Sequence, residues 1–431
     1  MQKSTVSQTE DLQSLLRILN GEIQTYLKPF ASRNVALPSL KCLPDLDSSA
    51  PYVTAGEVTE PRRNIIHICE KITALLQGPG TWLTLEACGH LTSSAISIAL
   101  KLRLPHLISS DANAPTSLDE LAKITAASPE LLMRILRHLT QRFIFEEIAP
   151  LYYVQNAMSK ALTDPVTDAW IGLTTTDFHR ASCELLEFFT EKNFQMPLDE
   201  KSAFSKAFKT NYSLYDYYSL VNPERGRYYA ASQRIRTTGP HTLYPYAHLP
   251  PGSRVVDVGG GSGHITVTLA RQYPGIRFII QDSADTIAYG QSVHGSEGLS
   301  IEWQQIDFFS EQPMKGAEVY LLRHVLIDHP DGITLKILNC IANAMDEKSR
   351  LLIADVVVPD RYGEDSDSLV NALDLYLLSL FNSKERSVEQ LAGLLGSVER
   401  PLEIVKVWRP DPLGAFDSVT EEALLEVKLK K

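Results

Sequence analysis

The sequence contains few cysteines, and no two of them have metal-binding spacing. Its five cysteines are scattered, odd in number and never arranged as C-x-x-C. Neither the disulfide framework of a small secreted domain nor a cysteine-based zinc site is therefore implied. We expect a protein that resides in a reducing compartment and binds no metal.

The chain also lacks a long apolar run and an excess of positive charge. No segment reaches the roughly 18 to 20 apolar residues that a membrane-spanning helix needs, and its beginning, MQKSTVSQTEDLQ, lacks the apolar core of a signal peptide. Its 41 basic and 52 acidic residues give a formal net charge of -11, which repels phosphate backbones and anionic lipids. We therefore expect a cytoplasmic protein whose partners include neither nucleic acid nor membrane.

The first part of the chain has the pattern of a helical domain. Apolar residues recur at helical spacing in five segments, which are 9–29, 62–77, 92–102, 117–125 and 128–142. Four prolines mark about 35–62 as a loop. Residues 143–155 alternate like a short hairpin, so that the region resembles a winged helix. A winged helix can bind DNA, but the acidic charge balance favours a packing or dimerisation role.

Aromatic residues gather in the middle of the chain, where they can form either a core or one wall of an apolar substrate pocket. They include Trp170, Phe178, Phe188, Phe189, Tyr212, Tyr215, Tyr217, Tyr218, Tyr228 and Tyr229. We therefore expect three parts: a helical, winged-helix dimerisation domain in 1–160, a helical substrate-pocket linker in 161–250, and a catalytic domain in 251–431.

From residue 253 onward, strand patterns alternate with helix patterns. SRVVDVGGG (253–261) reads as a buried strand that runs into a glycine turn, and IRFIIQD (276–282), EVYLLRHVL (318–326) and RLLIADVVVPD (350–360) read as further strands. Strands that alternate with helices require parallel pairing and crossover connections. The pattern predicts a doubly wound, Rossmann-like α/β sheet.

The first strand, the glycines and the following helix suggest a ligand site at the carboxyl edge of that sheet. A glycine turn alone is a weak signal, and this one departs from the dinucleotide spacing G-x-G-x-x-G. Asp257 stands two positions before the glycines, and Asp282 closes the second strand, where it is suited to hold ribose hydroxyls. Asp282 and Asp307 could instead be simple loop caps.

These residues together resemble the S-adenosylmethionine (SAM) site of class I methyltransferases. The resemblance implies SAM as the cofactor, with Asp257 near the amino group of its methionine moiety. It also implies that Asp307 and Phe308, in QQIDFF, hold the adenine. The cofactor-binding residues expected on this basis are Asp257, Gly259, Gly261, Asp282, Asp307, Phe308 and Arg323.

Further blocks resemble the small-molecule O-methyltransferases of plant phenylpropanoid and fungal secondary metabolism. The blocks are AFKTNYSLYDYYSLVNPE (207–224), LLIADVVVPD (351–360) and DLYLLSLFNSKERSVEQLAGLL (374–395), and the resemblance covers about residues 10 to 410. It implies a small-molecule substrate, apolar and polyketide-like or aromatic, and a homodimer formed through the N-terminal helices and the winged region.

The general base of that family is absent from the block YLLRHVLIDHPDG (320–332). Members carry a histidine–aspartate–tryptophan run there, and the histidine removes the proton of the substrate hydroxyl. Alignment on Arg323, Asp328 and Asp331 leaves the histidine position to Ile327 and the tryptophan position to His329. Isoleucine has no lone pair and cannot be the base, although Ile327 can shape the substrate pocket.

An intact SAM site without the base resembles the fungal methyltransferase-like pericyclases. In those enzymes SAM is kept as a fixed positive charge, and orientation and electrostatics lower the barrier to cyclisation. They place a cationic side chain where this chain has Ile327, so a hydrogen-bond donor must come from elsewhere. The candidate catalytic residues are His324, Asp328, His329, Asp355, Lys384 and Glu385, of which Asp355 and Glu385 match the carboxylates that flank the family's histidine.

Three functions therefore remain open on the sequence. The first is a SAM-binding pericyclase that acts on a polyketide-type intermediate. The second is an O-methyltransferase with a relocated base, or with a phenol acidic enough to ionise unaided. The third is a non-catalytic dimer partner of an active homologue.

Overall fold

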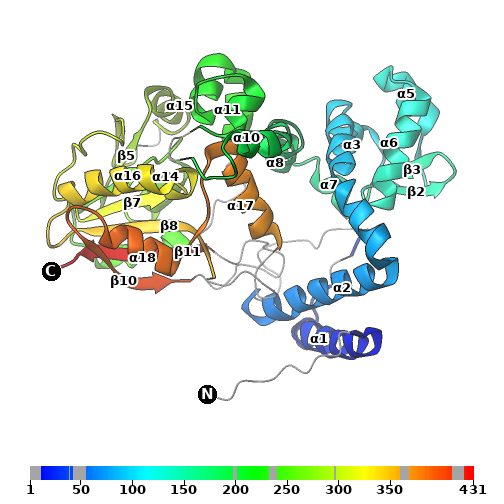
Figure 1. Ribbon diagram of the computed structural model, residues 1–431, viewed down its shortest axis with the longest axis horizontal. Helices are drawn as coiled ribbons and strands as arrows, with labels where there is room; N and C mark the ends of the chain where they lie inside the picture. The colour runs from blue at the N-terminus through cyan, green and yellow to red at the C-terminus, as the bar shows by residue number, and fades with distance from the viewer. Residues whose placement is uncertain are drawn as a thin grey trace. The chain divides into compact units, whose positions relative to one another are not determined.

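A computed structural model describes most of the chain as two compact units. The described residues are 11–37, 39–41, 55–197, 201–232, 240–295, 298–359, 368–409 and 422–431. Unit 1 lies within residues 1–176, and unit 2 contains the described residues from Asp177 onward (Figure 1). Among the described residues, no helix combines the length and the hydropathy that crossing a bilayer requires.

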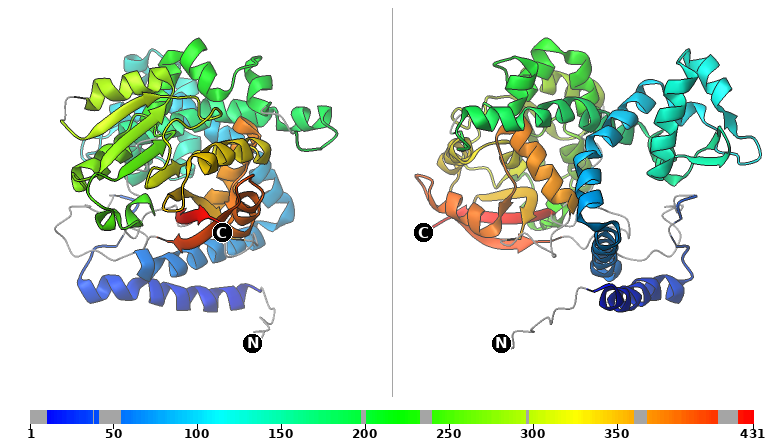
Figure 2. Two further views of the ribbon diagram at one scale, coloured as in Figure 1. Left: turned by 90° about the vertical axis from the view of Figure 1, so that its left-hand side faces the viewer. Right: turned by 45° about the vertical axis from the view of Figure 1, so that its right-hand side comes forward.

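Unit 1 is built mainly from helices. They are α1 (Leu12–Arg33), α2 (Ala55–Ala87), α3 (Gly89–Lys101), α4 (Leu104–Leu107), α5 (Leu118–Thr125), α6 (Pro129–Gln141), α7 (Ala157–Ala161) and α8 (Pro165–Leu173). Helix α1 begins where the carboxylate of Asp11 accepts a hydrogen bond from the Ser14 amide. Helices α1 and α2 lie side by side, as both views of Figure 2 show. The predicted helix 9–29 is confirmed from Leu12 onward, and residues 9 and 10 lie outside the described part.

Helix α2 differs from the expectation of a loop over 35–62 and a helix over 62–77. The helix already begins at Ala55, so the prediction of a loop is wrong for 55–61; residue 38 and residues 42–54 lie outside the described part. Gly78 has a φ of +73° and bends the helix just beyond the predicted end. Packing against α1 stabilises helical backbone that the local proline signal argued against.

The predicted wing is present in unit 1. Strands β2 (Glu146–Ala149) and β3 (Tyr152–Val154) form the antiparallel hairpin, and β1 (Thr116–Ser117) pairs with β3. The hydroxyl of Ser117 accepts a hydrogen bond from the Glu120 amide and so caps α5. Leu121, Leu132 and Leu136 are fully buried between the helices and the wing.

Unit 2 joins a layer of short helices to an α/β sheet. Its helices are α9 (His179–Cys183), α10 (Leu185–Glu191), α11 (Ala203–Phe208), α12 (Leu214–Asp216), α13 (Pro223–Ser232), α14 (His264–Gln272), α15 (Ala284–His294), α16 (Asp331–Ala344), α17 (Ser368–Phe381) and α18 (Val388–Gly396). Single-turn or π-helical segments are η1 (Thr174–Phe178, at the border of the units), η2 (Tyr217–Val221), η4 (Pro240–Leu243), η5 (Tyr246–His248) and η6 (Leu326–Asp328).

The large sheet has the strand order β6–β5–β4–β7–β8–β11–β10, with β9 paired to the end of β8. The strands are β4 (Arg254–Val258), β5 (Arg277–Asp282), β6 (Ile301–Gln305), β7 (Val319–Arg323), β8 (Arg350–Val358), β9 (Arg386–Ser387), β10 (Leu402–Trp408) and β11 (Glu422–Leu429). The five strands β6, β5, β4, β7 and β8 are parallel to one another. Strand β11 pairs antiparallel with β8 and β10. The predicted doubly wound α/β fold is confirmed.

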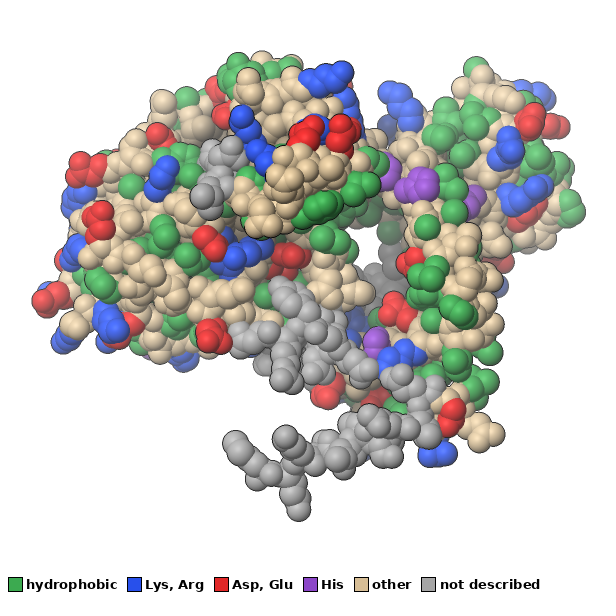
Figure 3. All heavy atoms as spheres, viewed as in Figure 1, with side chains coloured by type: hydrophobic (Ala, Val, Ile, Leu, Met, Phe, Trp, Pro, Cys, Tyr) green, Lys and Arg blue, Asp and Glu red, His purple; other side chains and the backbone are tan. Residues whose placement is uncertain are grey.

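The two faces of the sheet carry separate cores. Val256 and Leu322 point to the face covered by α16 and α18, whereas their neighbours Val255 and Leu321 point to the face covered by α14. This alternation is what a pleated sheet with helices on both faces requires. In the view of Figure 3, acidic and basic side chains intermingle over the coloured surface of unit 2.

The chain order reverses between β4 and β7. After β4 the chain adds β5 and β6 on one side, and then returns to place β7 and β8 on the other. Ligands of open α/β sheets bind outside the carboxyl ends of the strands at such a point. The glycine turn and the Arg323–His329 segment both follow strands that meet there.

Candidate cofactor and catalytic site

The glycine turn is held against β5 by its own backbone. The amides of Gly259 and Gly260 both donate to the carbonyl of Gln281, at 2.8 and 3.2 Å. A Cβ on Gly260 would lie 2.6 Å from Oδ2 of Asp257, and one on Gly263 would lie 2.7 Å from the ring of Trp303. The turn therefore leaves no room for side chains there, as expected of a cradle that brings backbone close to a ligand.

Asp257 is buried beneath this turn. Its carboxylate accepts a hydrogen bond from the hydroxyl of Thr266 in α14, and the side chain is 3% exposed. Burial raises the pKa of Asp257 to about 6, although the Thr266 hydrogen bond and the charge of Arg323 oppose the rise. A buried acid of this kind favours a nearby cation, which suits the positively charged end of SAM.

Asp282 connects the end of β5 to the glycine turn. One carboxylate oxygen accepts from the amide of Gly261 at 2.9 Å, and the other accepts from the amide of Ser283 at 2.7 Å. Burial raises its pKa despite these two bonds. Asp282 is therefore a loop cap, and its remaining lone pairs would serve the ribose hydroxyls.

Asp307 and Phe308 differ in their contacts: Asp307 bonds to its own loop, and Phe308 lies next to the glycine turn. The carboxylate of Asp307 accepts from the Phe309 amide and the Ser310 hydroxyl, at 3.0 and 3.1 Å, so it caps its own loop. The ring of Phe308 approaches to 3.9 Å from where a Cβ of Gly259 would stand. An apolar face next to the turn, as Phe308 provides, fits an adenine.

His329 belongs to this aromatic side of the site. Its ring meets Phe308 and Phe309 edge-on, with centroids 5.8 and 5.5 Å away. Burial lowers the pKa of His329 to about 4, and the nearby charge of Arg386 acts in the same direction. His329 is thus a neutral ring in the position that the family resemblance gives to an aromatic residue.

His324 faces a residue that the sequence reading missed. Its Nε2 lies 3.1 Å from Oε1 of Glu422, the first residue of β11. The backbone of His324 is left-handed, with a φ of +52°. Arg323 ends β7, and its positive charge lowers the pKa values of Asp257 and Asp355 against the effect of burial.

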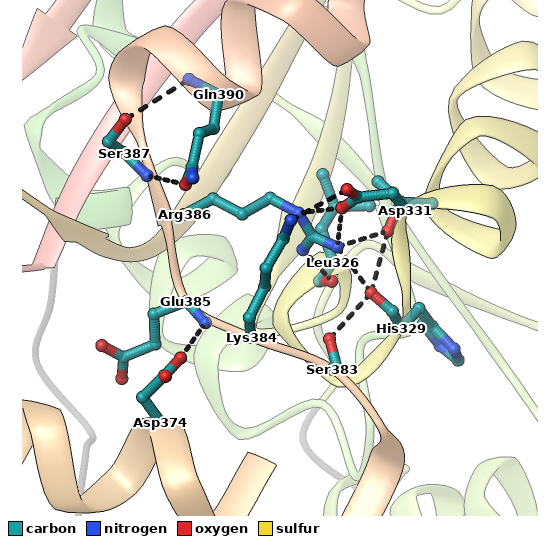
Figure 4. Close-up of polar contacts among 11 residues, drawn as sticks. Leu326, His329, Asp331, Asp374, Ser383, Lys384, Glu385, Arg386, Ser387 and Gln390 are labelled. Atoms are coloured by element: carbon teal, nitrogen blue, oxygen red, sulfur yellow. Dashed lines mark hydrogen bonds and ion pairs between the residues drawn. The ribbon is translucent and has the colours of Figure 1, made fainter. Parts of the chain in front are cut away.

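Arg386 contacts both ends of the turn between Leu326 and His329, as Figure 4 shows. Arg386 is 2% exposed. Its guanidinium donates to the carbonyls of Leu326 and His329 at 2.8 and 2.7 Å, and to Oδ1 of Asp331 at 2.8 Å. These bonds hold the η6 turn, in which Ile327 is 8% exposed.

The three remaining candidates, Lys384, Glu385 and Asp355, differ in environment. Lys384 pairs through Nζ with Oδ2 of Asp331 at 2.9 Å and is partly exposed. The backbone amide of Glu385 donates to Asp374, and its side chain is buried. Asp355 is 2% exposed, and its carboxylate oxygens accept no hydrogen bond from the residues that the structure describes. Burial raises its pKa well above the usual range, and the charge of Asp328 adds to this.

Asp328 makes a contact that the sequence reading did not identify. The hydroxyl of Tyr215, in α12, donates to Oδ2 of Asp328. The ring of Tyr215 stacks on Phe381 of α17, with centroids 5.6 Å apart. Tyr215 was visible in the sequence only as one of many aromatic residues, and nothing local linked it to Asp328.

The structure thus separates the candidates into two groups. The residues around the glycine turn form a cradle that fits SAM. Among the catalytic candidates, the side chains of His324, His329, Lys384 and Asp328 each contact another described residue. Asp355 and Glu385 are fully buried carboxyls, and Asp328 is half-buried.

Comparison with known proteins gives consistent matches. A family model for the O-methyltransferase domain matches residues 191–398, and one for the O-methyltransferase dimerisation domain matches residues 86–165. The chain is 37% identical to the O-methyltransferase xanE of Aspergillus fumigatus over 396 residues, which are 90% of this chain and 91% of that protein.

Solved structures share the fold. LepI in complex with SAM matches with a TM-score of 0.74 and 24% identity, covering 86% of this chain and 94% of LepI. A structure described as a pericyclic reaction enzyme matches with a TM-score of 0.74 and 23% identity, covering 97% of this chain and all (100%) of that one.

Proposed function

Because this chain belongs to the O-methyltransferase family and uses SAM, we propose that it transfers a methyl group to a hydroxyl oxygen of a secondary metabolite. When bound, SAM supplies that methyl group on a positively charged sulfur. Asp257, Asp282 and the glycine turn would hold the cofactor, with Phe308 beside the adenine.

The observation that carries this proposal is the engagement of the donor side chains near Ile327. A pericyclase without a cation at position 327 needs a donor from His324, His329 or Lys384. His324 faces Glu422 and Lys384 pairs with Asp331. His329 lies against two phenylalanine rings and is neutral, so it keeps one N–H donor but supplies no cation. The carboxyl of Asp328 follows Ile327 directly and interacts with that of Asp355, and a carboxylate can accept a proton.

A pericyclic cyclisation is the second candidate. Ile327 favours it, because the family's base is missing, and the fold is shared with a pericyclic reaction enzyme. The third candidate, a non-catalytic partner, has less support, because the glycine turn and its aspartates fit the cofactor.

The mass of the product separates the first two candidates. Purified protein would be incubated with SAM carrying a 13C-labelled methyl group and with extract from a producing host that lacks the gene. We expect a product heavier than its precursor by one labelled methylene unit. A product of unchanged mass and altered retention would instead establish isomerisation or cyclisation.

We also propose that the protein is a homodimer. The dimerisation domain matches residues 86–165, and α2 exposes large apolar side chains, with Leu76 68% and Leu83 65% exposed. Light scattering at micromolar concentration should therefore give twice the chain mass of 48.0 kDa. The mass of a single chain would contradict the proposal.

A further inference from the structure

Asp328 is anchored through one oxygen only. Its Oδ2 accepts the hydroxyl of Tyr215, and the hydroxyl of Tyr229 in α13 lies 3.4 Å from that of Tyr215. Its Oδ1 accepts no hydrogen bond within the described residues. A carboxylate held at one oxygen keeps the other available for a proton from a ligand.

We propose that Asp328 is the general base of this enzyme and that Tyr215 orients it. The inference rests on the proposed methyl transfer. The substrate hydroxyl gives its proton to Oδ1 of Asp328, and the oxygen's electron pair forms the new bond to the methyl carbon. The electrons of the broken carbon–sulfur bond remain on sulfur, so that S-adenosylhomocysteine leaves and the proton passes from Asp328 to water.

The protonation equilibrium of Asp328 supports this role. Burial raises its pKa to about 7, and the Tyr215 hydrogen bond partly opposes the rise. A general base works best when its pKa lies near the working pH. Because the basic form is the ionised one, the rate should be low well below pH 7 and rise through about pH 7 to a plateau.

Groups on four neighbouring elements face Asp328. Tyr215 of α12 and Tyr229 of α13 have pKa values raised by burial, and they stay neutral near pH 7. Burial and then the charge of Asp328 raise the pKa of Asp355 of β8 well above the usual range, so the two carboxyls influence each other's protonation, and the Tyr215 hydrogen bond distinguishes Asp328 from Asp355. Arg386 of β9 contacts the carbonyls that flank the turn, and it carries a fixed charge.

The strength of this base limits the substrate class. A phenol has a pKa of about 10, so a carboxylate of pKa about 7 removes its proton with an equilibrium disadvantage of roughly 10³. A hydroxyl as weakly acidic as water, with a pKa of about 15.7, imposes a disadvantage of roughly 10⁹. A base of this strength favours an acidic hydroxyl as acceptor, a phenol or an enol, over an aliphatic alcohol.

The test compares two variants with the wild type. Asp328→Asn keeps an acceptor for the Tyr215 hydroxyl but removes the basic group. We expect methyl transfer to fall by about 100-fold or more, while the dissociation constant for SAM, measured by calorimetry, stays unchanged. Unchanged SAM binding also establishes that the variant is folded.

Tyr215→Phe provides a second measurement that does not depend on losing activity. Removing the hydroxyl takes away a bond that stabilises the ionised carboxylate, so the pKa of Asp328 should rise. The rising limb of the pH–rate profile should then move to higher pH. Tyr152→Phe is the matched control, because Tyr152 is exposed on β3 of unit 1 and its hydroxyl forms no hydrogen bond within the described residues. Its profile should coincide with the wild type.

The outcomes separate the inference from the proposed function. Suppose that the wild type methylates its substrate. If Asp328→Asn then keeps the rate within about threefold, or if Tyr215→Phe leaves the rising limb of the pH–rate profile in place, Asp328 is not the base. The proposal of methyl transfer would still stand. If the wild type binds SAM but yields an isomer, both proposals fall. In that case a rate that decreases through about pH 7 would identify Asp328 as a proton donor.

Discussion

Replacing Asp282 with alanine is expected to weaken SAM binding by roughly 10² to 10⁴-fold and to abolish product formation. The cofactor would lose the two hydrogen bonds that we expect its ribose hydroxyls to donate to this carboxylate. Each such bond to a charged group is worth about 1.5 to 3 kcal/mol. It would also release the amide of Gly261, to which it is bonded at 2.9 Å. The cofactor would therefore lose both a direct contact and a positioned turn.

Isothermal titration calorimetry with SAM measures this effect, and Asp285→Ala is the matched control. Asp285 is exposed in α15, where it accepts a hydrogen bond from Ser219 and does not contact the glycine turn. The control should bind SAM as the wild type does. Full activity of Asp282→Ala in a preparation free of SAM would show that the cofactor is unnecessary for the reaction.

Replacing Arg386 with leucine is expected to lower the free energy of unfolding of unit 2 by about 3 kcal/mol. The change removes the charged donor from the buried carbonyls of Leu326 and His329. The Leu326 carbonyl keeps only the His329 amide at 3.2 Å, and the His329 carbonyl keeps the hydroxyls of Ser383 and Thr334. Breaking a buried ion pair costs roughly 3 to 5 kcal/mol, and we take the lower end because Asp331 is 44% exposed. The melting temperature should fall by about 6 to 12 °C.

Lys384→Ala is the control for this variant, because Lys384 contacts the same Asp331 from the surface. A partly exposed pair contributes less than about 1 kcal/mol, so its melting temperature should stay within a few degrees of the wild type. If the two variants melt together in calorimetry, Arg386 does not anchor the η6 turn. A large difference would establish that the turn depends on the buried guanidinium.

Much of the fold was predictable because its signals are local. The alternation of buried strands with amphipathic helices predicts the doubly wound sheet. The glycines after Val258 mark the turn that the structure places where the chain order reverses, between β4 and β7. The absence of a base at Ile327 was likewise visible, because it is a property of one residue. Such features depend on short stretches of chain, and short stretches can be read directly.

Contacts between distant residues were not predictable in the same way. Tyr215 and Asp328 are separated by 113 positions, and His324 and Glu422 by 98. No periodicity relates residues so far apart; only the packing of α12 and β11 against the strand ends brings them together. The sequence could therefore name Asp328 and His324 as candidates without indicating the partner of either.

The left-handed backbone of His324 affects how mutagenesis at this position should be interpreted. Histidine, asparagine and aspartate adopt this conformation more readily than most residues, and for others it costs about 1 to 2 kcal/mol. An alanine scan would therefore combine the loss of the imidazole with a distortion of the strand end beside the cofactor. Asparagine removes the ring while keeping the chain geometry, so it is the informative replacement at residue 324.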